Sequence, residues 1–285
     1  MVRRMRWTPA GRSEDLEDRR GTRVIRTGVG IGLGTVLILG VLSLITGQNL
    51  MGLLGPLQQI TGGDQVETVD EPVRASPEEE ERVQFVSFVL DDAQNTWRQV
   101  LPGRYQNAKL VLFRGAVQSA CGFAQAAMGP FYCPLDEKVY IDLSFYDELR
   151  QRFGAQAGDF AQAYVLAHEI GHHVQRQLGI DGKVRAAQRQ RPDLQNELSV
   201  RLELQADCLA GVWGHSTNQR KILEAGDVED AMNAAAAIGD DRIQKMSLGY
   251  VQPESFTHGS SKQRMQWFMR GFQSGDVNDC DTFNG

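Results

Sequence analysis

Charged and apolar positions are unevenly spread along the chain. Residues 27–47 are rich in Val, Leu, Ile and Gly, and no charged residue occurs from Gly28 to Gly47. About 20 apolar residues in a helix can cross a bilayer, so this segment predicts a single transmembrane helix. A buried core helix is disfavoured because the uncharged stretch continues to Gly63. A cleaved signal peptide is disfavoured by the long apolar region and by the lack of a clear Ala-x-Ala site.

The remaining residues form three segments around this predicted anchor. Residues 1–26 are predicted to be a mobile basic tail. Residues 48–76 are rich in Gly, Gln and Pro and then in Asp and Glu, which is typical of a linker. Residues 77–285 are long enough to form a domain with its own core.

Helical and alternating patterns predict the elements of this domain. A helix begins at Pro77 and presents Phe85, Phe88, Val89 and Trp97 on one face up to about residue 100. Further helices are predicted at about 144–153, 159–178, 198–213, 228–246 and 260–272, and strands at 108–113 and 138–145. Helices outnumber strands, so we expect an α+β fold, mainly helical with a small β-sheet. The strand over 138–145 is either an edge to which a peptide could add or an interior strand.

Charge placement suggests a compartment. The net charge is −6, yet residues 1–26 carry eight arginines against four carboxylates, so the rest of the chain is strongly acidic. An acidic body argues against a nucleic-acid partner. A basic flank before an apolar segment predicts a cytoplasmic N-terminus. We therefore expect a single-pass protein of the inner, or plasma, membrane whose domain lies outside the cytoplasm, in the periplasm or its equivalent.

Four cysteines fit an oxidising compartment and allow three pairings. We expect a Cys121–Cys133 disulfide that closes a short loop and a Cys208–Cys280 disulfide that ties the C-terminal residues to the core. Buried free thiols remain the alternative. A cysteine-based metal site is disfavoured because the chain has no Cys-x-x-Cys motif.

The most informative motif is His168-Glu169-Ile170-Gly171-His172. In a helix, His168 and His172 lie on one face one turn apart and can bind a single Zn²⁺, while Glu169 can take a proton from a zinc-bound water. Alternatively, the motif is a chance match on a helix whose histidines face solvent.

A catalytic zinc site usually has three protein ligands and one open position. A third histidine six residues after His172 is absent, since Leu178 occupies that position. Glu203 on the following predicted helix can supply the third ligand, and Asp207 on the same face can accept a hydrogen bond from His168. The alternative for Glu203 and Asp207 is a solvated acidic face.

Together these motifs resemble the neutral zinc metallopeptidase family of bacterial membrane-anchored proteins, and the resemblance covers nearly the whole chain. The matching segments are 121–122, 129–134, 139–145, 167–175, 203–208 and 258–261. The resemblance implies a zincin fold with a gluzincin-like site, in which His168, His172 and Glu203 are the ligands and Glu169 is the general base. More distantly, the segment from His258 to Arg264 is similar to one in membrane-associated peptidases with a Thr-His-Pro sequence, where this chain has Gly259 in place of Pro.

We therefore expect a zinc-dependent metalloendopeptidase that cleaves protein or peptide substrates outside the cytoplasm. Besides the metal, the carbonyl oxygen of the scissile bond needs a hydrogen-bond donor, for which His258 is the first candidate and Tyr164 and Arg264 are weaker ones. Two other functions remain open at this point. The domain could be an inactive, zinc-stabilised scaffold of the envelope, or a hydrolase of other amides or esters.

Overall fold

The computed structural model describes residues 5–27, 65–153 and 158–284. They form two compact units, of which one contains residues 5–19 and 74–284 and the other contains residues 20–73 without the segment left undescribed. The smaller unit is an antiparallel pair of strands, β2 (Thr22–Thr27) and β3 (Gln65–Asp70). Thr22 faces Asp70 at one end of this pair, and its hydroxyl donates a hydrogen bond to the Asp70 carboxylate.

The expected fold needs a correction at the predicted transmembrane helix. No helix within the described ranges is both long enough and apolar enough to cross a membrane. The segment 27–47, on which the prediction rested, lies outside the described residues except for Thr27, which belongs to β2. The structure therefore gives the predicted membrane span no support.

The larger unit contains a four-stranded sheet of mixed direction, ordered β1-β4-β8-β7. Strand β1 spans Leu16–Asp18, β4 Lys109–Phe113, β7 Phe131–Cys133 and β8 Lys138–Asp142. Strands β1 and β8 run parallel to β4, whereas β7 is antiparallel to β8. Both predicted strands are present. Of the two alternatives for residues 138–145, the structure has the interior strand, and β7 forms the edge beside it. A short hairpin of β5 (Ala116–Ser119) and β6 (Gly122–Gln125) follows β4.

The segment assigned to a basic tail is partly built into this unit. Strand β1 completes one edge of the sheet, and Met5 is buried in the hydrophobic core. Asp15 accepts hydrogen bonds from the side chains of Gln94, Asn107 and Lys109. Residues 5–19 therefore belong to the same unit as residues 74–284, and their arginines do not mark a separate tail.

Helix α3 (Pro77–Val100) begins as its sequence predicts. The Ser76 side chain accepts a hydrogen bond from the backbone N–H of Glu79, and Pro77 occupies the first helical position. Its buried face, which includes Val86, Val89 and Trp97, packs on α5. Burial of each such large apolar side chain contributes about 1.5–3 kcal/mol to stability.

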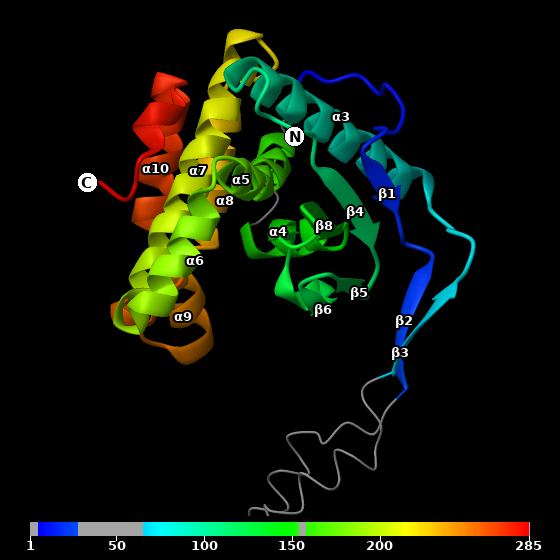
Figure 1. Cartoon of the computed structure of the whole chain (residues 1–285). Helices are drawn as coiled ribbons and strands as arrows, with labels where there is room; N and C mark the ends of the chain where they lie inside the picture. Colours follow the sequence, from blue (N-terminus) through cyan, green and yellow to red (C-terminus); the bar gives the residue numbers. More distant parts are fainter. Residues whose placement is uncertain (1–4, 28–64, 154–157, 285) are drawn as a thin grey trace, which may run out of the picture. The chain divides into compact units, whose positions relative to one another are not determined.

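Seven α-helices follow α3 among the described residues, and Figure 1 shows their arrangement. They are α4 (Phe145–Phe153), α5 (Asp159–Gln177), α6 (Ile180–Gln190), α7 (Gln195–Gln219), α8 (Asp227–Ala237), α9 (Asp240–Leu248) and α10 (Ser261–Ser274). Helix α10 lies along α7, and its N-terminus is capped by Ser260. Phe160, Tyr164, Trp213 and Phe268 form an aromatic cluster where α5, α7 and α10 meet.

Two helical predictions differ from the structure. The single helix expected over 228–246 is broken at Gly239 into α8 and α9. A Cβ atom at Gly239 would lie 2.4 Å from the backbone nitrogen of Ser261, so the break allows the start of α10 to approach. The sequence predicts no element between residues 178 and 198, where the structure has α6, a short 3₁₀ turn and the beginning of α7.

Both expected disulfides are present. Cys121 pairs with Cys133, and Cys208 pairs with Cys280. The first joins Cys121, the residue before β6, to the last residue of β7. The second holds the 3₁₀ turn Val277–Cys280 against α7.

Candidate metal centre

Close packing of α5 on α7 brings the sequence motifs together. Gly171 lies between the two histidines of the motif, and a Cβ atom at this position would be 2.9 Å from the backbone oxygen of Ala206 on α7. Real Cβ atoms essentially never approach that closely. A glycine at position 171 therefore lets the two backbones approach, and the side chains beside it on α5 meet those beside Ala206 on α7.

The meeting side chains form a group that could hold a metal ion. His168, His172 and Glu203 each offer one ligand atom, and these atoms lie within 4.8 Å of one another. The Glu203 carboxylate lies 3.1 Å from His168 Nε2 and 3.5 Å from His172 Nε2. Tetrahedral ligands about 2.0–2.2 Å from a zinc ion are about 3.4 Å apart, so the cluster has the spacing that zinc requires.

Charge balance also favours a divalent cation here. The carboxylates of Glu169, Glu203 and Asp207 are each at least four-fifths buried. The guanidinium of Arg264 is buried beside Asp207. Once the histidines give up their protons to bind a metal, Arg264 alone cannot balance these three carboxylates, and a divalent cation would supply the missing positive charge. Burial opposes ionisation of Glu203, but the neighbouring histidines lower the pKa of this carboxyl well below its usual range. The residues present therefore fit a zinc ion in both geometry and charge.

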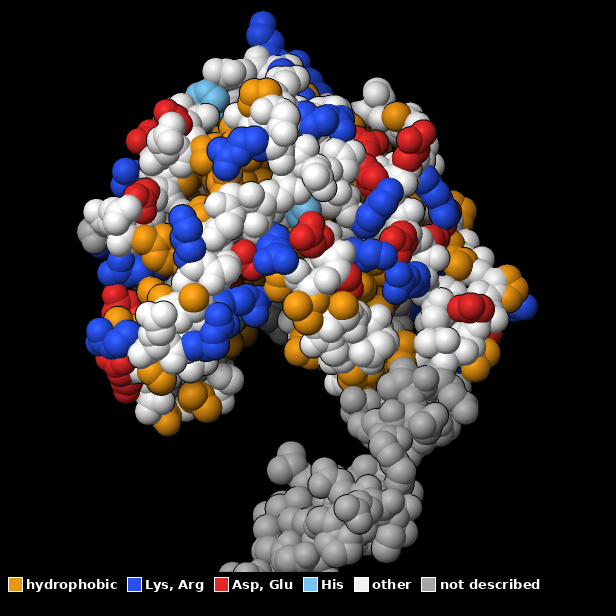
Figure 2. Space-filling view, in the orientation of Figure 1, with side chains coloured by type: hydrophobic (Ala, Val, Ile, Leu, Met, Phe, Trp, Pro, Cys, Tyr) orange, Lys and Arg blue, Asp and Glu red, His pale blue; other side chains and the backbone are white. Residues whose placement is uncertain are grey.

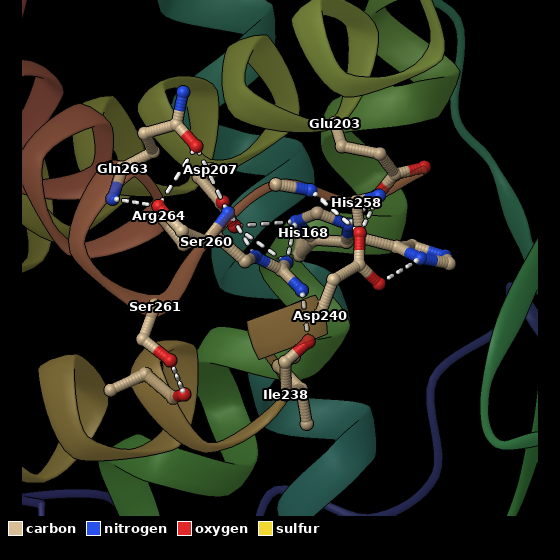
Figure 3. A network of polar contacts seen from close by, with 12 residues as sticks. His168, Glu203, Asp207, Ile238, Asp240, His258, Ser260, Ser261, Gln263 and Arg264 are labelled. Atoms are coloured by element: carbon tan, nitrogen blue, oxygen red, sulfur yellow. Dashed lines mark hydrogen bonds and ion pairs between the residues drawn. The ribbon is translucent and has the colours of Figure 1, made fainter. Parts of the chain in front are cut away.

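Asp207 is completely buried and organises the side chains behind His168 (Figure 3). Its carboxylate accepts hydrogen bonds from His168 Nδ1 at 2.9 Å and from Arg264 Nε at 2.8 Å, and also from the Tyr164 hydroxyl. Burial raises the pKa of Asp207, but Arg264 and His168 outweigh it and lower the value to about 2. Asp207 therefore stays ionised and directs Nε2 of His168 toward Glu203.

Metal binding must compete with a proton at His168. Burial lowers the pKa of this imidazole, but the Asp207 and Glu203 carboxylates raise it to about 10. In the metal-free protein a proton thus holds His168 between two carboxylates. A metal ion that takes the Nε2 lone pair releases that proton.

The cluster opens into a cavity of about 360 Å³. Glu169, His258 and Arg264 line it together with the three candidate ligands. Its apolar lining includes residues 127–131, Ile238 and Ile243. In Figure 2, apolar side chains gather on α9 and around the β5–β6 hairpin, on either side of a hollow. A larger cavity of about 890 Å³ lies between α6, α7 and residues 275–284, but it contains none of these polar groups.

His258 lies at the rim of the first cavity and is held by Asp240. One Asp240 oxygen accepts hydrogen bonds from the backbone N–H groups of Thr257, His258 and Gly259. The other lies 3.3 Å from His258 Nδ1 (Figure 3). This contact raises the pKa of His258, whose side chain is 52% exposed. The imidazole is therefore oriented by Nδ1 and presents Nε2 to the cavity as a donor when protonated.

The structure places the residues singled out by sequence in different ways. His168, Glu169, His172, Glu203, Asp207 and His258 all belong to one site. Tyr164 and Arg264, the weaker candidates for a hydrogen-bond donor to the substrate, both hydrogen-bond Asp207 instead. Sequence reasoning missed Asp240 and Gln175. Asp240 starts a helix that was not expected to begin there, and Gln175 looks like any polar residue of α5.

The chain matches, over residues 5–283, the family described as "Putative neutral zinc metallopeptidase". It is similar to uncharacterized protein YpfJ of Escherichia coli strain K12, with 48% identity over 291 residues, 98% of this chain and 99% of the relative. It is also similar to uncharacterized protein Rv2575 of Mycobacterium tuberculosis strain H37Rv, with 44% identity over 198 residues, 66% of each chain. No solved structure matches the chain.

Proposed function

Since the chain belongs to the neutral zinc metallopeptidase family, we propose that it is a zinc-dependent endopeptidase whose catalytic centre is the cluster on α5 and α7. His168, His172 and Glu203 would hold the metal. One observation carries this assignment: two imidazole nitrogens and one carboxylate converge at ligand spacing. A second carboxylate, that of Glu169, lines the same cavity but is not one of the candidate ligands. A purely structural zinc site would be closed by a fourth protein ligand.

The residues around the metal divide the remaining tasks. Bound zinc lowers the pKa of a water to about 7 and polarises the substrate carbonyl. Glu169 accepts the proton of the attacking water and passes it to the leaving amine. His258 donates a hydrogen bond from Nε2 to the carbonyl oxygen as that oxygen gains charge. Asp207 and Asp240 orient His168 and His258 and do not contact the substrate.

The cleft suits an extended polypeptide with apolar side chains. Strand β7 ends the sheet within the described residues, and its Phe131 and Tyr132 line the cavity. A peptide can add to this edge as a further antiparallel strand, which places one of its carbonyls over the cluster. Met128 and Ile243 are exposed, and both line the cleft. Unfolded protein, which presents both a free backbone and apolar side chains, is therefore the substrate class that we propose.

The two disulfides suggest where the protein works. Disulfides persist in oxidising compartments and are rare in the cytosol. Cys133 and Cys280 are completely buried, and Cys208 is buried in α7 next to the site. We therefore place the activity outside the cytoplasm.

Removal of the metal provides the first test. Treatment of the purified full chain with a zinc chelator is expected to abolish cleavage of an unfolded protein, and stoichiometric Zn²⁺ is expected to restore it, because the water is activated only at the metal. The measurement is the release of acid-soluble peptides together with the zinc content. Undiminished cleavage by protein shown to contain no metal would refute the proposal.

The Asp240–His258 contact predicts a shift in the pH dependence of cleavage. The Asp240 hydrogen bond, with help from the charge of Glu203, raises the pKa of His258, while Arg264 lowers it. The protonated donor therefore persists above the usual histidine range, and the rate falls as pH rises through the raised pKa. In Asp240→Asn, whose amide oxygen can still accept backbone hydrogen bonds, that fall is expected to begin at lower pH.

This shift is measured as the pH profile of kcat/KM on a fluorogenic peptide. Asp241→Asn is the control, because the Asp241 carboxylate accepts hydrogen bonds from Ser261 and does not contact His258. An alkaline limb that coincides in Asp240→Asn and wild type would remove His258 from the mechanism.

A further inference from the structure

The second histidine of the motif is oriented by a group that neither the sequence nor the family assigns. His172 Nδ1 lies 2.8 Å from Oε1 of Gln175, three residues further along α5. Gln175 is completely buried. An amide oxygen only accepts hydrogen bonds, so this contact places the His172 proton on Nδ1 and leaves the Nε2 lone pair for a metal.

The orientation of the Gln175 amide follows from its other contacts. Its NH₂ group donates to the backbone oxygen of Leu202 at 2.7 Å and to Oε1 of Gln205 at 3.1 Å. The Gln205 NH₂ group in turn donates to the backbone oxygen of Cys280 at 2.8 Å. Backbone carbonyls can only accept, so Leu202 and Cys280 fix both amides in the orientation that turns the Gln175 oxygen toward His172.

This network joins the two helices that carry the ligands. Leu202 precedes Glu203 on α7, and Gln205 lies on the same helix. Cys280 is held to α7 by its disulfide with Cys208. The buried Gln175 side chain of α5 is thus hydrogen-bonded to the turn of α7 that carries Glu203. Through Gln205, it is also linked to the C-terminal segment that contains Cys280.

We propose that Gln175 is the positioning residue of His172 and that Gln205 acts through Gln175 by locking its amide. His168 is oriented by a charged pair, Asp207 and Arg264, whereas His172 is oriented by neutral amides anchored on main-chain carbonyls. The proposal rests on the proposed function only in taking zinc as the ligand. Because it concerns metal affinity, it can be tested without any cleavage assay.

The test is a zinc titration of the metal-free full chain against a competing chromophoric chelator. Loss of a group that hydrogen-bonds a metal-bound histidine typically weakens metal binding about 10–100-fold, and we expect a loss in this range for Gln175→Met. Gln205→Met leaves the contact with His172 in place and is expected to cause a smaller loss. Since Gln205 acts through Gln175, the double variant should bind zinc about as weakly as Gln175→Met alone.

Gln94→Met is the matched control. Gln94 is 1% exposed, and its amide donates to Asp15 in a different part of the same unit. The control loses a buried amide of the same size, so it should be destabilised in thermal unfolding but bind zinc like wild type. The visible spectrum of the Co²⁺ form should change in Gln175→Met and not in Gln94→Met, since it reports ligand geometry.

Three results would overturn the inference. They are equal zinc affinities of Gln175→Met and Gln94→Met, full additivity of the Gln175 and Gln205 losses, and unchanged Co²⁺ spectra. If Gln175→Met fails to fold, the zinc affinity of Gln205→Met serves as the test. A wild-type affinity in that variant would show that Gln205 does not hold the Gln175 amide in its orientation. Absence of zinc binding by the wild type would instead refute the proposed function, so the two failures are distinguishable.

Discussion

Glu169→Gln is expected to bind zinc as tightly as wild type and to lose cleavage of an unfolded protein by about 10²–10⁴-fold, the usual contribution of a general base. The amide has almost the same size as the carboxylate but cannot accept a proton from water at neutral pH. Glu169 lines the cavity outside the ligand group, so its replacement leaves the metal site intact. The measurement pairs zinc content with turnover on the same preparation.

Glu148→Gln is the control for this variant. Glu148 lies on α4 and lines the same cavity, but it has no role in the proposed mechanism. The control removes a carboxylate from the cleft and should retain activity within a few-fold of wild type. Comparable activity of Glu169→Gln and wild type would end the water-activation mechanism, even if zinc is bound.

Arg264→Met is expected to lower the free energy of unfolding of the metal-free protein by about 3–5 kcal/mol, the cost typical of removing one partner of a buried ion pair. Arg264 is 2% exposed and Asp207 is fully buried. Nε and one NH₂ group of Arg264 bind the two Asp207 oxygens at 2.8 and 2.9 Å. Without the guanidinium, the charged Asp207 carboxylate still pays the free-energy cost of burial, but it no longer has the ion pair that chiefly offsets this cost. The measurement is urea unfolding at neutral pH.

The pH dependence of this loss has a defined sign. In wild type the pKa of Asp207 is lowered to about 2, so its stabilising effect is present above the unfolded-state value and is lost only as pH falls toward 2. Arg264→Met loses the largest influence that opposes burial, so the pKa of Asp207 is expected to rise. Protonation then relieves the cost, and the gap to wild type narrows in acid. Stability differences that stay constant with pH would contradict this account.

Two further variants separate the buried charge from other causes. Arg264→Met combined with Asp207→Leu removes both charges and should recover part of the lost stability, since replacing a whole buried pair is often neutral. Arg191→Met breaks a pair with Asp193 in which both side chains are about 60% exposed, and little change is expected there. Equal losses in Arg264→Met and in the double variant would indicate lost packing and not an unpaired charge.

Sequence alone located the parts of the site that depend on short-range periodicity. His168, His172, Glu203 and Asp207, which the structure brings together, are recognisable because residues four positions apart share a helical face. What sequence could not supply is the contact between helices. The close approach at Gly171 and the amide network of Gln175 depend on which helices pack together, and α7 follows α5 only after the intervening α6.

The same reasoning explains the errors in the fold. Strand β1 has only three residues and pairs in parallel with β4, far along the chain, so no local alternation marks it. The break between α8 and α9 depends on contact with Ser261, which a helical pattern over 228–246 cannot reveal. Apolar composition predicted a membrane span over 27–47 that no described helix supports.

The order in which the site's parts occur along the chain has a consequence for biosynthesis. The motif on α5 and Glu203 on α7 leave the ribosome first, whereas Asp240, His258, Arg264 and Cys280, which support them, follow later. A nascent chain that has only reached α7 therefore has its metal ligands but lacks the guanidinium behind Asp207 and the carbonyl that locks Gln205. The cavity around the candidate ligands is therefore completed only after these later residues have been made, and the Cys208–Cys280 disulfide can form only then.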